Sequence, residues 1–182
     1  MTFLIASITP VIIFLYLIYR KDTIKEPKGL LAKCFFGGFL SIVITLIIDI
    51  TMSTFGDSFS DPLVKSFWDA FLVASFPEEL SKFLILYWLV WKSKEFDQHY
   101  DGITYAVFVS MGFALIENIL YVFQGGLGVA LARSVLSVPG HGFFAVLMGY
   151  YFSLAKFAPI EFSRRSRSAF FAEKKDSWAA RK

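Results

Sequence analysis

The sequence predicts an all-α protein, a polytopic membrane bundle of about five transmembrane helices. Hydrophobic residues make up 56% and aromatic residues 19% of the 182 residues, only 18% are charged, and the mean hydropathy is +0.59. This composition is too apolar for a soluble domain of such a length. Five apolar stretches each approach the roughly 20 residues that cross a hydrocarbon core as a helix, and they cover residues 3–19, 34–54, 67–91, 103–123 and 129–157.

The first stretch is expected to be a retained helix and not a cleaved signal peptide. Pro10 lies inside it, and no basic residue precedes it. Arg20 and Lys21 follow it, where small residues would mark a cleavage site.

The third stretch is expected to be kinked or broken near Pro77. Ser60-Asp61-Pro62 and Ser75-Phe76-Pro77 both have the pattern of a helix start, with a capping side chain followed by a proline in the first turn. Turn residues separate the other stretches, at Glu26-Pro27-Lys28-Gly29, Phe55-Gly56-Asp57 and Gln124-Gly125-Gly126.

The distribution of basic residues predicts the orientation, because positively charged loops stay on the cytoplasmic side. All but three of the 18 Lys and Arg residues follow the first, third and fifth stretches. Lys65 and Arg133 fall on the opposite side, and Lys82 falls inside the membrane. The chain is therefore expected to be a multi-pass protein of the cell membrane, with its N-terminus outside and its C-terminus in the cytoplasm.

One membrane domain over residues 1–160 and a basic cytoplasmic tail over residues 161–182 are predicted. The tail is expected to contact solvent or anionic membrane lipid and not nucleic acid. The net charge of +3 is explained by the basic residues that set the orientation in the membrane, so it does not indicate a nucleic-acid site. Cys34 is the single cysteine, which excludes an intrachain disulfide and a metal site with several cysteines.

Ionisable side chains occur deep in the predicted spans. Such groups are costly in a bilayer, so they normally face the protein interior and mark an ion pair or a functional path. They are Glu78, Glu79 and Lys82 in the third stretch, Glu117 beside Asn118 in the fourth, and His141 in the fifth.

Glu79, Glu117 and His141 are expected to share one depth. At the rise of an α-helix, they lie about 18, 21 and 22 Å above the cytoplasmic ends of their stretches. This common level is in the outer half of the bilayer. Three helices that bring two acids and an imidazole to one level predict a convergent polar site.

A purely structural role is the alternative for each of these residues. Lys82 follows Glu78 by four residues and Glu79 by three, so an ion pair on one helix face would account for some of the charges. It would leave the third carboxylate, Glu117, unexplained. Glu117 or His141 taken alone would more often be a hydrogen-bonded packing group than a catalyst.

Clustered carboxylates with an imidazole suit peptide hydrolysis. That reaction needs an activated water, a group that takes and returns a proton, and a donor or cation at the developing oxyanion. A carboxylate can serve as the base, and His141 can donate to the oxyanion or bind a metal. Glu79, Glu117 and His141 are the candidate ligands for a zinc ion with an open position for water. A metal-free glutamate mechanism stays equally open.

Three motifs occur at these residues in a fixed order. The first is Phe76-Pro77-Glu78-Glu79-Leu80-Ser81-Lys82, which contains Glu-Glu-x-x-Lys. The second combines Asp101-Gly102-Ile103-Thr104-Tyr105-Ala106 with Gly112-Phe113-Ala114-Leu115-Ile116-Glu117-Asn118, and the third is Pro139-Gly140-His141-Gly142. Over residues 3–157 this series resembles the PrsW-type intramembrane proteases, distant relatives of the CAAX prenyl endopeptidases and bacteriocin-processing enzymes.

The resemblance implies an endopeptidase that makes the first, site-1 cut in a single-pass membrane protein, an anti-sigma factor, on its extracytoplasmic side. A downstream site-2 protease would then free a sigma factor for a stress response. The resemblance also implies that Glu78 activates the water with support from Glu79. Glu117 would form a second polar wall, and His141 would be the oxyanion donor or a metal ligand. Lys82 would hold the carboxylates in place, and Asn118 would be a second supporting residue.

The sequence departs from this family after the third motif. Members usually continue into a further apolar helix with a second His in a His-Gly-x-Tyr-Asp-like motif, whereas this sequence passes into the basic tail. An active protease without that motif and a shortened, inactive form both remain open. Two readings of other classes also remain, an inactive regulator that binds a partner's transmembrane segment, and a cation or proton carrier.

Overall fold

The computed structural model describes the backbone of residues 1–179 and the side chains of residues 1–158. Every regular element within residues 1–179 is helical, so the predicted all-α class is confirmed. The elements are α1 (Thr2–Lys21), α2 (Lys28–Gly56), α3 (Pro62–Trp68), the π-helical segment η1 (Asp69–Ser75), α4 (Phe76–Val90), α5 (His99–Val135) and α6 (Ser137–Ala179).

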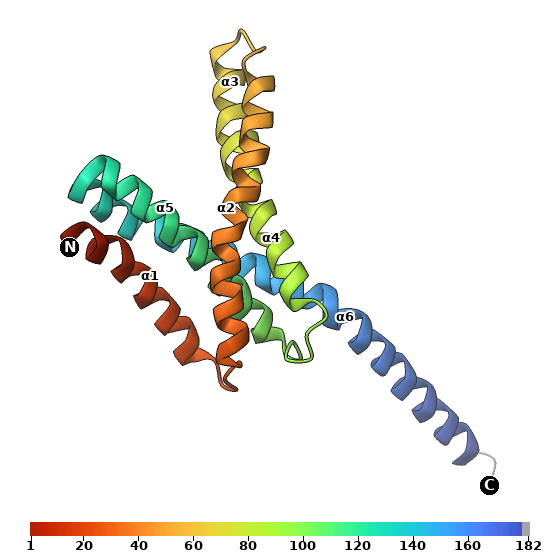
Figure 1. Ribbon diagram of the computed structural model, residues 1–182. Helices are drawn as coiled ribbons and strands as arrows, with labels where there is room; N and C mark the ends of the chain where they lie inside the picture. The colour runs from red at the N-terminus through yellow and green to blue at the C-terminus, as the bar shows by residue number, and fades with distance from the viewer. Residues whose placement is uncertain (180–182) are drawn as a thin grey trace.

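The predicted tail begins within α6, whose backbone continues as helix to Ala179 (Figure 1). The side chains of residues 159–182, and residues 180–182 as a whole, lie outside the described part. Contact of the tail with lipid therefore stays a prediction.

Three helical stretches of the described chain are long and apolar enough to cross a membrane, Thr2–Lys21, Lys28–Gly56 and His99–Ala158. The last has 60 residues and contains two helices, α5 and the apolar part of α6. The predicted third stretch is helical but divided among α3, η1 and α4. These three stretches make the protein polytopic, and the number of five spans stays a prediction.

Helix α5 is the centre of the bundle and packs against α1, α2, α4 and α6 (Figure 1). The chain reverses at Gly126, inside the predicted turn, where φ is 74° and the helical conformation is lost. Glycine adopts this positive φ without the steric cost that a Cβ would bring. After the reversal the chain runs back along α5, so that Gly149 of α6 meets Gly102 near the start of α5.

Two pairs of glycines allow the helices to approach α5 closely. Gly38 of α2 lies against the backbone of Val109 and Phe113, and a Cβ at Gly112 would collide with the carbonyl of Phe35. On the other side of α5, a Cβ at Gly149 would collide with the backbone of Gly102. Small residues at such crossings let backbones come together, which is typical of helices packed in a membrane.

The predicted break near Pro77 takes the form of the π-helical segment η1. The N–H of Phe76 bonds to the carbonyl of Phe71, five residues back, in place of the usual four. Pro77 has no N–H, and its ring would clash with the carbonyl four residues earlier, so a widened turn just before it relieves the conflict. The predicted start at Asp61-Pro62 is confirmed, because the Asp61 side chain accepts from the N–H groups of Leu63 and Val64. The predicted cap at Ser75 is wrong, because Ser75 is itself helical and its hydroxyl donates to the Ala70 carbonyl.

The end of the bundle that is expected to face the cytoplasm holds a cluster of buried acids. Tyr105 donates to Glu26, and Thr104 Oγ1 donates to Asp22 Oδ2 at 3.5 Å. Asp101 accepts from the N–H groups of Asp97 and Gln98, just before the start of α5. Burial raises the pKa of Glu26 to about 7, with the charges of Asp101 and Asp22 adding to the effect and the Tyr105 hydrogen bond opposing it.

Folding should therefore become less favourable as pH rises past the ordinary pKa of Glu26. The unfolded chain releases this proton near pH 4.5 and the folded chain near pH 7, so the folded state binds more protons between these values. The free energy of unfolding should fall across this interval, and Glu26→Gln should remove that part of the fall. At pH 8 the variant should be more stable than the wild type by about 1–2 kcal/mol.

Thermal unfolding in detergent at pH 5 and pH 8 measures this difference. Glu95→Gln changes an exposed glutamate and should leave the pH dependence as it is in the wild type. An equal pH dependence in Glu26→Gln and the wild type would show that the Glu26 proton is not linked to folding.

Candidate active site

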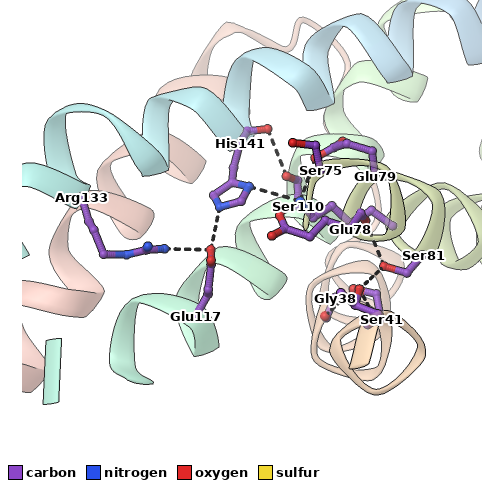
Figure 2. Close-up of polar contacts among 12 residues, drawn as sticks. Gly38, Ser41, Ser75, Glu78, Glu79, Ser81, Ser110, Glu117, Arg133 and His141 are labelled. Atoms are coloured by element: carbon purple, nitrogen blue, oxygen red, sulfur yellow. Dashed lines mark hydrogen bonds and ion pairs between the residues drawn. The ribbon is translucent and has the colours of Figure 1, made fainter. Parts of the chain in front are cut away.

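The polar residues singled out in the sequence converge where α4, α5 and α6 meet. Glu78 and Glu79 lie in the first turn of α4, Glu117 lies in the middle of α5, and His141 lies in the first turns of α6. In Figure 2 the ring of His141 lies between Glu117 on one side and the α4 side chains on the other. The expectation that three helices bring these groups to one level is met.

Lys82 is the centre of the α4 side of the site. Its Nζ donates to Glu79 Oε1 at 2.8 Å and to Glu78 Oε2 at 3.4 Å. It also lies 3.1 Å from Nδ1 of His141 and 4.1 Å from the ring centroid of Phe113. Only 1% of the lysine side chain is exposed, so its charge is compensated by these neighbours and not by water.

His141 links the two halves of the site through its two ring nitrogens. Because the Lys82 ammonium can only donate, Nδ1 of His141 is the acceptor. Nε2 then carries the hydrogen and donates to Glu117 Oε2 at 2.8 Å. Ser110 donates to the His141 carbonyl at 3.0 Å, which also fixes the backbone of α6 against α5.

Arg133 is a site residue that the sequence analysis missed. Its Nη2 donates to Glu117 Oε2 at 2.7 Å and its Nε donates to Asn118 Oδ1 at 2.7 Å. The orientation argument treated Arg133 as an outer loop charge, but α5 continues past the reversal and carries it back to Glu117. The available signal was an arginine inside an apolar stretch of the sequence.

Asn118 is held between this arginine and α1. Its Nδ2 donates to the carbonyl of Ser7 at 3.4 Å, and its side chain is buried. The contacts of Asn118 therefore give it a structural role, since they hold Arg133 and α1 in place against α5.

The carboxylates of α4 line an open cavity of about 380 Å³. Its walls are formed by η1, α4 and α6, and the residues are Phe71, Ser75, Glu78, Glu79, Ser137, Gly140, His141 and Phe144. A larger groove of about 540 Å³ lies between α1 and the α5–α6 hairpin, but it is lined by apolar side chains with only Thr9 and Ser134 as polar ones. The smaller cavity is therefore the one equipped for acid–base chemistry.

The donor atoms of Glu78, Glu79 and His141 lie within 4.8 Å of one another, as in a set that could hold a metal ion. This set shares two members with the expected ligands, whereas Glu117 bonds to the other nitrogen of His141. A carboxylate behind a histidine is a usual support for a metal ligand. Lys82, however, lies within hydrogen-bonding distance of all three donors, so the residues as placed do not fit a metal ion in addition to the ammonium.

The fold and the site together define a class, a polytopic helical membrane protein with a cluster of glutamate, lysine and histidine beside an open cavity. Residues 26–173 match the family described as PrsW family intramembrane metalloprotease. The chain belongs to this family.

Curated relatives agree with that membership. The chain is 38% identical to the Protease PrsW of Geobacillus kaustophilus over 154 residues, 84% of this chain and 66% of the relative. It is 39% identical to that of Clostridioides difficile over 166 residues, 87% of this chain and 68% of the relative, and 36% identical to that of Bacillus subtilis over 154 residues, 84% and 68% of the two chains. The chain thus spans about two thirds of the length of these relatives. No solved structure matches it.

Removal of Arg133 should destabilise the bundle, because it leaves the partly buried Glu117 without its counter-charge. The two side chains are 13% and 18% exposed, so Arg133→Met should lower the free energy of unfolding by about 2–4 kcal/mol. The double variant with Glu117→Gln should recover part of this loss, with a coupling energy of about 1–3 kcal/mol. Unfolding of the purified protein in detergent measures all three variants.

Lys65→Met is the matched control, since Lys65 forms an exposed ion pair with Asp57 at 3.1 Å. This change should alter the stability by no more than about 1 kcal/mol. If Arg133→Met changed the free energy of unfolding no more than Lys65→Met does, the contact with Glu117 would not stabilise the fold.

Proposed function

We propose that this chain is an intramembrane endopeptidase that hydrolyses a peptide bond with the groups around Lys82. The observation that carries the proposal is the open cavity at Glu78 and Glu79, next to a buried cation and a buried imidazole. Hydrolysis requires a base for the water and a positive group for the oxyanion, and this cluster holds both.

Glu78 is assigned as the base that activates the water. Lys82 binds Glu79 at 2.8 Å but Glu78 at 3.4 Å, so the Glu78 carboxylate is the less firmly held of the two. It therefore has lone pairs free to take a proton from a water in the cavity. The hydroxide formed attacks the scissile carbonyl, and Glu78 then passes the proton to the leaving amine.

Lys82 is assigned to stabilise the oxyanion through its positive charge, because its three N–H groups already have acceptors in the site. Glu79 is assigned to hold Lys82 in position. His141 was expected to donate to the oxyanion, but its Nδ1 accepts from Lys82 in the structure. In this mechanism His141 positions Lys82, while Glu117 and Arg133 hold the imidazole in the required tautomer.

The substrate is proposed to be a single-pass membrane protein, an anti-sigma factor cut first on its extracytoplasmic side. Support comes from the likeness of the motifs to the PrsW-type proteases, and a site-2 protease would follow in the same pathway. The chain is proposed to lie in the cell membrane with its N-terminus outside, in agreement with the positive-inside distribution of its basic residues.

The first test is co-expression with a tagged single-pass anti-sigma factor in a host that lacks its own enzyme, with loss of the full-length substrate followed by blot. The wild type should clip the substrate, and Glu78→Gln should slow cleavage by about a hundredfold or more, because the amide cannot take the proton. Glu95→Gln, at an exposed glutamate, should cleave like the wild type.

Cleavage by Glu78→Gln at the wild-type rate would exclude Glu78 as the base. An intact substrate with the wild type, together with binding of its transmembrane segment, would favour the inactive regulator.

The second test addresses the orientation by cysteine labelling. Cys34 is buried, and Cys34→Ser gives a background without cysteine. In that background a membrane-impermeant maleimide should label Asp57→Cys on intact cells, whereas Lys94→Cys should react only after the cells are opened. Both positions are exposed on the protein. The reverse pattern would place the N-terminus in the cytoplasm.

A further inference from the structure

Lys82 occupies the position that a divalent metal would take in this site. The three donors that lie within 4.8 Å of one another belong to Glu78, Glu79 and His141. The Lys82 ammonium contacts one polar atom of each of these side chains, at 3.4, 2.8 and 3.1 Å. The group that could hold a metal is thus already organised around a cation of the chain itself.

The hydrogen-bonding capacity of the ammonium is fully used at this position. A lysine ammonium has three N–H donors, and two carboxylate oxygens and one imidazole nitrogen accept them. The ring of Phe113 lies 4.1 Å from Nζ and adds a cation–π contact. With 1% of its side chain exposed, Lys82 has these contacts in place of water.

A metal ion and this ammonium cannot use the same donors together. A zinc ion would need one oxygen of each glutamate and the Nδ1 lone pair of His141 at about 2.0–2.2 Å. The carboxylates keep other lone pairs, but the single Nδ1 lone pair of His141 is directed to the ammonium. A positive charge a few ångströms from a divalent ion also repels it strongly in a low-dielectric interior. Lys82 lies on the same helix as both glutamates, three and four residues further on, so all three side chains share one helix face.

We propose that Lys82 is the resident cation of this site and that it excludes a divalent metal from Glu78, Glu79 and His141. The proposal rests on the proposed function only in treating this cluster as the reacting centre. Removal of the ammonium would free the same three side chains to hold a metal ion beside the cavity.

Cobalt(II) binding to the purified full-length chain tests the proposal without any substrate. The visible absorption of bound cobalt reports its ligands, and the metal content is measured after dialysis. The wild type should bind cobalt at this site far below one ion per chain. Lys82→Met should bind one ion per chain, at least about a hundredfold more tightly, because a unit positive charge beside the ion has been removed.

Three variants serve as controls. Lys82→Arg keeps the charge and should bind no more cobalt than the wild type. Lys82→Met with His141→Ala should lose the site that Lys82→Met creates. Lys82→Gln, which keeps a polar side chain next to the glutamates, replaces Lys82→Met if the latter fails to give a folded helical protein by circular dichroism, and it should also bind more cobalt than the wild type.

Two outcomes would overturn the proposal. One is a wild-type chain that binds one cobalt ion with a spectrum that Glu78→Gln or His141→Ala abolishes. The other is a folded Lys82→Met or Lys82→Gln chain that binds no cobalt. Because neither readout involves proteolysis, a failure of the protease assignment would leave the cobalt result interpretable, and the reverse is equally true.

Discussion

The compensation of one buried charge, the ammonium of Lys82, constrains how the helices of this protein meet. A charge inside a membrane protein needs partners at close range, and those partners lie on α4 itself and on α6. His141 in turn depends on Glu117 of α5, and Glu117 depends on Arg133. A shift of α5 or α6 by one turn, about 5.4 Å along its axis, would leave at least one of these groups unpaired. The site therefore fixes the register of three helices.

Much of this arrangement was predictable, because it follows from the spacing of residues along one helix and from their positions along the apolar stretches. The spacing of Glu78, Glu79 and Lys82 puts them on one face of a helix, whatever packs against it. The position of Glu117 and His141 along their apolar stretches sets their level in the membrane. Pro77, with its missing N–H, predicted a disturbance in the helix, and η1 is that disturbance.

Other features depend on contacts between distant residues that no local pattern encodes. The pairing of Arg133 with Glu117 follows from the way the chain folds back after Gly126, so counting charges per loop gave only the side of the membrane on which Arg133 was expected. The hydrogen-bond acceptors around Lys82 were also missed in part, because depth alone does not say which nitrogen of His141 faces α4. The number of spans stays open because α3, η1 and α4 divide one apolar stretch into short pieces.

The π-helical segment η1 controls the direction in which the reacting groups of α4 point. A π-helical turn contains more residues than an α-helical turn, so the helix that follows is rotated about its axis relative to the helix that precedes it. Trp68, before η1, is bound to the Met52 carbonyl of α2 at 2.9 Å, and Glu78 follows η1. With Trp68 anchored, loss of one residue from η1 would turn Glu78 by about 100° around α4, away from Glu117 and α6. The number of residues in η1 therefore sets the direction in which Glu78 points. An insertion or deletion in η1 would rotate the α4 side chains away from the site although no polar side chain had been altered.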